Sequence, residues 1–256
     1  MYHWLTYLPF VAAPLHALGF VLYAKQALKG ESAPQIVSWG LWAFLATLNA
    51  LTFRQMSDNV TALVSLTGSA GCIILFIYVL FIGKFTKMTR SEGVQLTAGV
   101  IAIFVWMNTN ATIANVLLVG IALGSFTPTF RAVLKNPYAE KPAPWWLWGI
   151  AYLFTTIFTF LFRDGWTAKM IMPITLTALH GIVPFMVTER RRYNWRKKGA
   201  RKLKDLREYI RVLESDLNFE RRHLPMVERM AMRKPIDLLL EKRKAQEKEL
   251  AQLLGM

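Results

Sequence analysis

Acidic side chains are missing from the apolar parts of this chain. Its 256 residues include 16 Asp and Glu against 31 Lys and Arg, and no charged residue stands in the middle of a long apolar run. Cys72 is the only cysteine, so an intramolecular disulfide is excluded, and its apolar surroundings predict a small core residue. Motifs such as HExxH, GxSxG and GxxxxGK[ST] are absent, as are Cys/His pairs at metal-binding spacing. We therefore expect no enzyme activity, no cofactor and no metal site.

Long apolar runs are what the sequence has instead. Hydrophobic residues make up 54% of it, and they arrive in blocks of about 20, the length that crosses a bilayer as a helix. Seven such blocks lie at residues 4–24, 34–53, 60–83, 93–107, 110–130, 144–162 and 167–187. No basic residue precedes the first block, so we interpret it as a retained span, not a signal peptide. The sequence predicts an all-α membrane domain over residues 1–187 and a basic, water-exposed tail over residues 188–256.

The second and sixth blocks resemble each other. With a shift of 109, residues 141–163 match residues 32–54 at five positions of 23, including Trp148-Gly149 on Trp39-Gly40 and Phe162-Arg163 on Phe53-Arg54. A second match precedes this one, in which Phe20 meets Phe126 and Lys29 meets Lys135. The same order of features in both halves indicates an internal duplication.

Basic residues in the loops predict the orientation. Alternate short loops carry eight basic residues on one side and two on the other, and the tail belongs to the richer side. The positive-inside rule then places the N-terminus outside and the tail in the cytoplasm, with an odd number of spans. Two parallel three-helix repeats, at about residues 4–83 and 110–187, need a linker helix at about 93–107 to keep one orientation. Parallel repeats of this kind are one known plan of transporters, which bind the substrate between the repeats.

This plan resembles the SWEET and PQ-loop (MtN3-like) family of membrane transporters over the seven spans, about 187 residues. The local patterns that carry the resemblance are Phe126-Thr127-Pro128, a short basic loop and then Pro144-Trp145-Trp146, with Pro34 opening the second span and Gly71, Tyr78 and Lys84 closing the third. The resemblance implies a seven-helix 3+1+3 fold and facilitated movement of a solute.

Asn49 is the most polar residue well inside the second span, and the repeat alignment sets it against Phe158. An amide on one wall and an aromatic ring on the other would suit a small polar solute. Thr67 and Thr175 add hydroxyl groups, and His180 and His16 are the titratable groups within the spans. The alternative for each is packing: a hydrogen bond between helices for Asn49 or a histidine, and a bond back to its own helix for a threonine.

Prolines mark possible hinges. Proline removes a backbone hydrogen bond and kinks a membrane helix, and Pro128 is the candidate hinge inside a span. Pro34 and Pro144 are grouped with it, although their fixed φ also suits the start of a helix.

The tail has two features. Nine of the 15 residues from Arg190 to Lys204 are basic, which favours contact with anionic lipid headgroups. Apolar residues then repeat with spacings of three and four, as in a coiled coil: Leu203, Leu206, Ile210, Leu213 and Leu217. A helical hairpin or a homo-oligomeric coiled coil would bury this seam. Acidic residues are interspersed along it, so nucleic-acid binding is the weaker interpretation.

The leading functional hypothesis is a facilitative transporter of a small polar solute that works by alternating access. Coupling to protons is not expected, because the spans lack a carboxylate. The alternative is a membrane scaffold or sensor that assembles, or recruits a partner, through its tail.

The loop charges generate a test of topology. In single-cysteine variants, a cysteine introduced at Asp164 should react with an impermeant reagent added to intact cells, and one introduced at Lys198 should not. Labelling of intact and of lysed cells gives the comparison. The reverse pattern would overturn the orientation, and the parallel-repeat hypothesis with it.

Overall fold

The structure is a computed structural model of the chain that describes residues 3–32, 34–82, 87–138, 140–162, 167–223 and 226–254, with side chains of the last two helices through 215, at 218 and from 237 onward. Within these ranges the regular structure is helical, and no strand occurs. The chain divides into two compact units, residues 1–190 and 191–256. The expected all-α fold is confirmed at this level.

Six helices or helix pairs of the first unit are long and apolar enough to cross a membrane. They contain α1 (Leu8–Leu28), α2 (Ile36–Met56), α3 (Leu63–Ile82), the α5–α6 pair (Ala111–Ser125 and Thr127–Lys135), α7 (Pro142–Phe162) and the first part of α8 (Ile171–His223). Short 3-10 turns precede α1 (His3–Tyr7) and α8 (Ala168–Met170). The architecture is therefore compatible with a multi-pass membrane protein.

The expected fourth span is helix α4 (Arg90–Asn108), which has the length of a span but is less apolar than the six. Its first turn is polar, because Thr89 and Glu92 form a capping box: the Thr89 side chain accepts from the Glu92 N–H, and the Glu92 carboxylate accepts from the Thr89 N–H. Ser38 on α2 also donates to Glu92, at 2.7 Å. The polar start thus fixes α4 against α2 and lowers its mean hydropathy.

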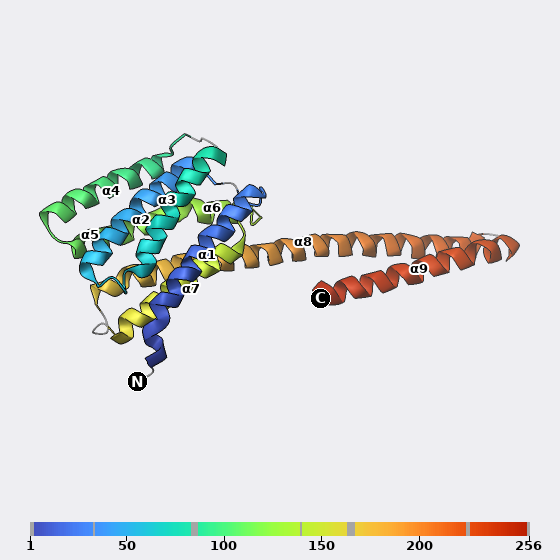
Figure 1. Ribbon diagram of the computed structural model, residues 1–256. Helices are drawn as coiled ribbons and strands as arrows, with labels where there is room; N and C mark the ends of the chain where they lie inside the picture. Colours follow the sequence, from blue (N-terminus) through green and yellow to red (C-terminus); the bar gives the residue numbers. More distant parts are fainter. Residues whose placement is uncertain are drawn as a thin grey trace. The chain divides into compact units, whose positions relative to one another are not determined.

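Helix neighbours in the first unit cross the boundary between the expected repeats. Helix α1 packs against α7 and α3, α2 packs against α3 and α5, and α4 lies on α5 and α2 (Figure 1). The first helix of each expected repeat, α1 or α5, therefore contacts the second helix of the other, α7 or α2. Between these helices lies a core of buried aromatic and aliphatic side chains.

The contact between α1 and α7 depends on a glycine. A Cβ at Gly19 would lie 2.6 Å from Cδ1 of Trp148, closer than side chains pack, so only glycine leaves room for the indole. Trp148 is 1% exposed, and its Nε1 donates to the carbonyl of His16 at 3.2 Å. A buried indole N–H needs such a partner, and the missing side chain lets the ring reach it.

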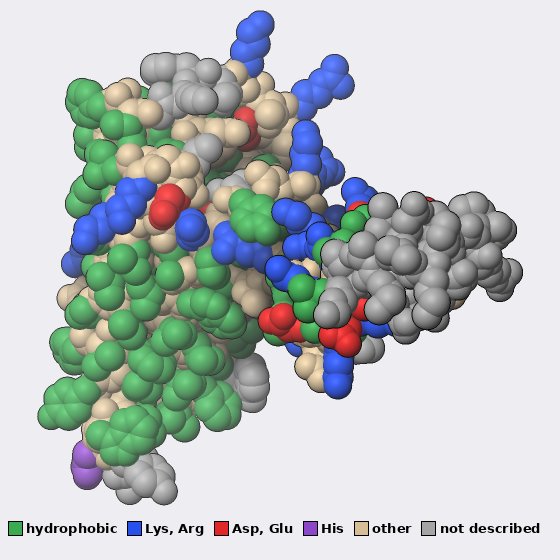
Figure 2. Space-filling model, turned by 90° about the vertical axis from the view of Figure 1, so that its right-hand side faces the viewer, with side chains coloured by type: hydrophobic (Ala, Val, Ile, Leu, Met, Phe, Trp, Pro, Cys, Tyr) green, Lys and Arg blue, Asp and Glu red, His purple; other side chains and the backbone are tan. Residues whose placement is uncertain are grey.

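Exposed apolar side chains cover the outside of the membrane unit. Figure 2 shows a broad field of hydrophobic side chains, with Lys and Arg gathered above it. Phe10, Ile74, Phe81, Phe104 and Phe185 are among the large apolar residues that are more than half exposed. An exposed apolar surface of this extent is unfavourable in water. It is the surface that lipid would cover.

The second unit is a hairpin in which the end of α8 packs against α9 (Met226–Leu254). Glu247 accepts from Arg207 at 2.7 Å, and Lys244 pairs with Glu214 at 2.6 Å. Of the expected seam, Leu203 and Ile210 are buried, whereas Leu206 and Leu213 are half-buried and the side chain of Leu217 lies outside the described residues. The seam thus packs within one chain; association between copies stays a prediction.

Gly19 supplies a test of the α1–α7 contact. Gly19→Ala should lower the free energy of unfolding by about 1–3 kcal/mol, because the methyl group displaces the Trp148 ring from a filled site. Gly120→Ala is the matched control, since a Cβ there meets no atom within 4 Å. Thermal unfolding of the two variants in detergent would measure the difference, and equal stability would contradict the described contact.

Candidate functional site

A cavity of about 90 Å³ lies inside the membrane unit. Helices α1, α2, α3, α5, α7 and α8 contribute to it, together with Phe126 at the end of α5. Its lining residues are His16, Phe20, Trp39, Trp42, Leu45, Ala46, Asn49, Gly68, Cys72, Leu118, Ala122, Ser125, Phe126, Trp148, Tyr152, Met172, Leu176 and His180. A water needs about 10–15 Å³ of such space, so the cavity has room for a few waters or one small solute.

Two histidines flank one tyrosine in this wall. The ring of His16 lies 5.0 Å from that of Tyr152, and the ring of His180 lies 5.3 Å from the same ring, between centroids. His16 is 2% exposed and His180 is 7% exposed. The first and last helices of the membrane unit therefore bring both of their histidines to one cavity.

Asn49 enters the cavity from α2 and is held from behind by α5. Nδ2 of Asn115 donates to Oδ1 of Asn49 at 3.0 Å and lies 3.0 Å from Oγ1 of Thr52. The Thr52 hydroxyl donates to the carbonyl of Leu48 at 2.9 Å. This buried network occupies Oδ1 of Asn49, whose NH₂ group donates to no other residue in the described part of the chain.

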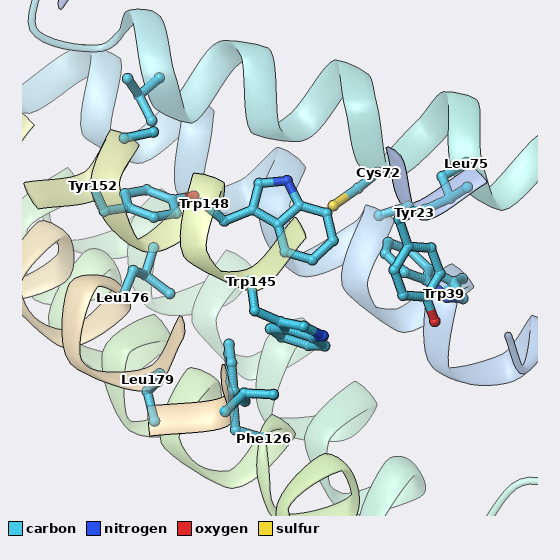
Figure 3. Close-up of a cluster of buried hydrophobic side chains, with 14 of the residues drawn as sticks. Tyr23, Trp39, Cys72, Leu75, Phe126, Trp145, Trp148, Tyr152, Leu176 and Leu179 are labelled. Atoms are coloured by element: carbon cyan, nitrogen blue, oxygen red, sulfur yellow. The ribbon is translucent and has the colours of Figure 1, made fainter. Parts of the chain in front are cut away.

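Six aromatic rings also line the cavity, and several of them lie together in the buried hydrophobic cluster (Figure 3). The ring of Trp148 packs against those of Phe20 and Tyr23, at 5.0 and 5.9 Å, and Tyr23 also contacts Trp39 at 5.0 Å. On the other side, Trp42 stacks on Phe126 at 5.3 Å. Trp39 and Trp148 are matched positions of the predicted duplication, as are Phe20 and Phe126, and all four line the cavity.

A third pair of matched positions, Thr47 and Thr156, contacts the neighbouring helix in each half. Thr47 on α2 lies 2.9 Å from Ser69 on α3, between hydroxyl oxygens. Thr156, which aligns with Thr47, lies 3.5 Å from Thr177 on α8. In each half a hydroxyl contact thus joins the second expected helix to the third, and the residue on the second helix is the matched one.

The expected site residues divide into two groups. Asn49 and His180 line the cavity, whereas Phe158, Thr67 and Thr175 do not. Phe158 is buried and packs on Phe162 at 5.2 Å between ring centroids. Thr67 and Thr175 donate to carbonyls one turn earlier on their own helices, at 2.8 and 2.7 Å, which is the packing alternative for a membrane threonine.

The expected hinge prolines also differ in position. Pro128 lies in the first turn of α6, directly after the break at Phe126, so the fifth apolar block is interrupted at this point. Pro144 lies in the first turn of α7, and Pro34 precedes α2. Pro34 and Pro144 thus occupy helix starts, and Pro128 is the one beside a helix break.

Four cavity-related residues were not among the expected binding residues: His16, Tyr152, Cys72 and Asn115. His16 was noted as titratable, and Asn115 carries the same signal as Asn49, an amide in an apolar block. Tyr152 had no such signal, because one apolar helix holds several aromatic residues. Among the described residues, no group of His, Cys, Asp and Glu has the arrangement to hold a metal ion.

No protein-family model, curated protein or solved structure matches this chain. The SWEET and PQ-loop resemblance accordingly depends on the local patterns alone.

Glu140 lies in the segment between α6 and α7 and contacts Trp145. Its carboxylate accepts from Nε1 of Trp145 at 3.1 Å. The Trp145 ring in turn packs on Trp148 at 5.2 Å and on His180 at 5.8 Å, both of which line the cavity. Burial raises the pKa of Glu140 to about 7, and the hydrogen bond from Trp145 lowers it less than burial raises it.

This pKa predicts a pH dependence of stability. A carboxyl group whose folded-state pKa exceeds its ordinary value of 4.5 stabilises the fold most below pH 4.5, and the contribution is lost as pH rises toward 7. The free energy of unfolding of the native protein should therefore fall by on the order of 2 kcal/mol across this window relative to Glu140→Gln. Thermal unfolding between pH 4 and 8 measures it, with Glu31→Gln as the control for loss of a charge. Parallel curves for the native protein and Glu140→Gln would contradict the prediction.

Proposed function

We propose that the membrane unit is a facilitative transporter of a small polar solute, with its binding site in the central cavity. The observation that carries the proposal is the cavity itself, in which His16, His180 and Asn49 meet within walls of aromatic rings. Ligand sites combine apolar walls with a few oriented polar groups in this way. At about 90 Å³, the cavity suits a solute smaller than benzene, which fits a cavity of about 150 Å³.

The proposal includes seven spans in a 3+1+3 arrangement, with α4 as the linker. Three features support it: the sequence match of the two halves, the reciprocal contacts of α1 with α7 and of α2 with α5, and the paired hydroxyl contacts of Thr47 and Thr156. Helices related by a twofold axis would make such contacts in pairs. Parallel repeats of this type place a substrate on the axis, near the middle of the membrane.

Alternating access requires that the cavity open to each side in turn. The break at Phe126 supplies a place for movement, because the regular helix is interrupted there and Pro128 follows. Phe126 also stacks on Trp42 and packs against His180, at 5.3 and 5.0 Å. A change of angle at this break would therefore move a wall of the site.

The proposed orientation has the N-terminus outside and the hairpin in the cytoplasm. The exposed basic residues between Arg190 and Lys204 would then meet the anionic lipid headgroups of the inner leaflet.

The alternative is a scaffold or sensor that acts through the hairpin. Within that unit, Leu206, Tyr209, Leu250 and Leu253 line an open groove between the two helices, and Leu253 is 62% exposed. A groove of this kind would serve a second copy or a partner helix. The two hypotheses make different predictions for the cavity of the membrane unit. A transporter must open it to each side of the membrane, whereas a scaffold has no need to open it.

Cys72 is a natural probe for this difference, because the only cysteine lines the cavity. A transporter that alternates should expose it to a small, impermeant thiosulfonate from the outside of sealed vesicles and, in inverted vesicles, from the inside. Modification is counted by mass spectrometry of the intact protein.

Cys72→Ala is the blank, and denatured protein gives full labelling. Labelling from neither side, with full labelling after denaturation, would reject alternating access and favour the scaffold. Labelling from one side alone would fit a sensor that binds its ligand from that side.

A further inference from the structure

The polar atoms that face the cavity have donor and acceptor roles that the structure assigns. Nδ1 of His180 lies 2.8 Å from the carbonyl oxygen of Leu176. A carbonyl can only accept, so Nδ1 carries the proton, and Nε2 of the neutral ring is left with a lone pair. His180 therefore offers an acceptor.

His16 also lines the cavity, but its Nδ1 is not an acceptor for a ligand there. This atom is fully covered by the surrounding protein and has no hydrogen-bond partner among the described residues. A Cβ at Gly68 would lie 2.7 Å from Cε1 of His16, so the glycine provides the space in which the ring sits. The His16 ring therefore contributes to the wall, and His180 supplies the assigned acceptor.

Asn49 offers the opposite role. Its Oδ1 accepts from Asn115, and within the described part of the chain its NH₂ group donates to no other residue. An amide held in this way presents donors to the cavity. The site as a whole therefore requires a ligand that donates to an imidazole nitrogen and accepts from an amide.

The lining contains no Asp, Glu, Lys or Arg. A buried charge without a partner is unfavourable, so the site selects against ionic ligands. Flat rings such as those of Trp42 and Phe126, which stack on each other, form part of the wall, and aromatic faces favour contact with a planar ligand. A primary amide is a small, planar, uncharged molecule that carries both a hydrogen-bond donor and an acceptor, so it meets these requirements.

We propose that the cavity binds a small uncharged amide of the size of acetamide, whose N–H group donates to Nε2 of His180 and whose carbonyl accepts from Asn49. That this amide is also the transported solute rests on the proposed function. Binding of the amide does not, because a site can bind a ligand without transporting it.

Three isosteric probes test the proposal on the full chain in detergent. Acetamide has both roles, acetone lacks the N–H donor, and acetate carries a charge; methylammonium is added as a small cation. Acetamide should raise the melting temperature in a saturable manner, and its apparent affinity should exceed that of each other probe at least tenfold, because the analogue without a donor leaves a buried acceptor unpaired.

A variant links the binding to the assigned atom. His180→Phe keeps an aromatic ring but removes Nε2, and it should weaken acetamide binding at least tenfold; Asn108→Ala, on the exposed surface of α4, should not. Equal binding of acetone or acetate to the native protein would overturn the proposal, as would absence of a saturable shift. Tightest binding of methylammonium would overturn it in favour of a cation site on the aromatic rings. If acetamide binds in a saturable manner but Cys72 is labelled from neither side of the membrane, the proposed binding site stands and the proposed transport is rejected.

Discussion

The bond from the Trp148 indole to the carbonyl of His16 is the contact on which the centre of this protein depends. It exists because Gly19 has no side chain, so α7 approaches α1 closely enough for the ring to lie against the backbone. The His16 side chain leaves the same residue and turns toward Tyr152. Trp148 packs on Tyr23 and lies 5.8 Å from His180. One packing event between two helices thus positions both histidines and most of the aromatic wall.

Much of the helical architecture could be predicted from apolar length. The blocks at residues 34–53 and 144–162 correspond to α2 (Ile36–Met56) and α7 (Pro142–Phe162) within a few residues, since nothing in lipid but a helix satisfies the backbone within one segment. The block at 110–130 was less well predicted. It breaks at Phe126 and continues to Lys135, because proline at the start of α6 prevents the ladder of hydrogen bonds from running through.

The end of the seventh block could not be placed from apolar length either. Helix α8 continues from Ile171 to His223, far beyond the apolar stretch that ends near Val187. The residues that follow are mostly Arg and Lys, which are good helix formers, and neither proline nor a left-handed glycine intervenes to stop the helix. Polarity marks where a bilayer ends, but it carries no signal that a helix ends there.

The site could be predicted only in part, because the depth of a residue along its helix and the direction in which its side chain points are separate properties. Asn49 and His180 were found as polar residues in apolar surroundings, and both line the cavity. Phe158 was inferred from its alignment with Asn49. The alignment predicts that two matched residues lie at equal depth in the membrane. It does not predict which way their side chains point, because a helix turns by about 100° per residue. A small difference in rotation between α7 and α2 therefore gives matched side chains different neighbours. Trp39 and Trp148 face the same cavity, so the duplication preserves direction at one position and not at another.

The polarity of the cavity bears on the source of energy. Coupling to protons needs a group that changes charge as the solute is carried, and in the sequence the two histidines occupy separate spans without a titratable partner. The structure brings them to either side of Tyr152, so their separation along the chain is no argument against a joint role. What argues against coupling is the lining itself. An imidazolium formed there would meet no carboxylate among the cavity residues, and its charge would lie uncompensated in an apolar site. Neutral imidazoles carry no such charge, so the proposed binding of an uncharged solute would favour movement of that solute down its gradient.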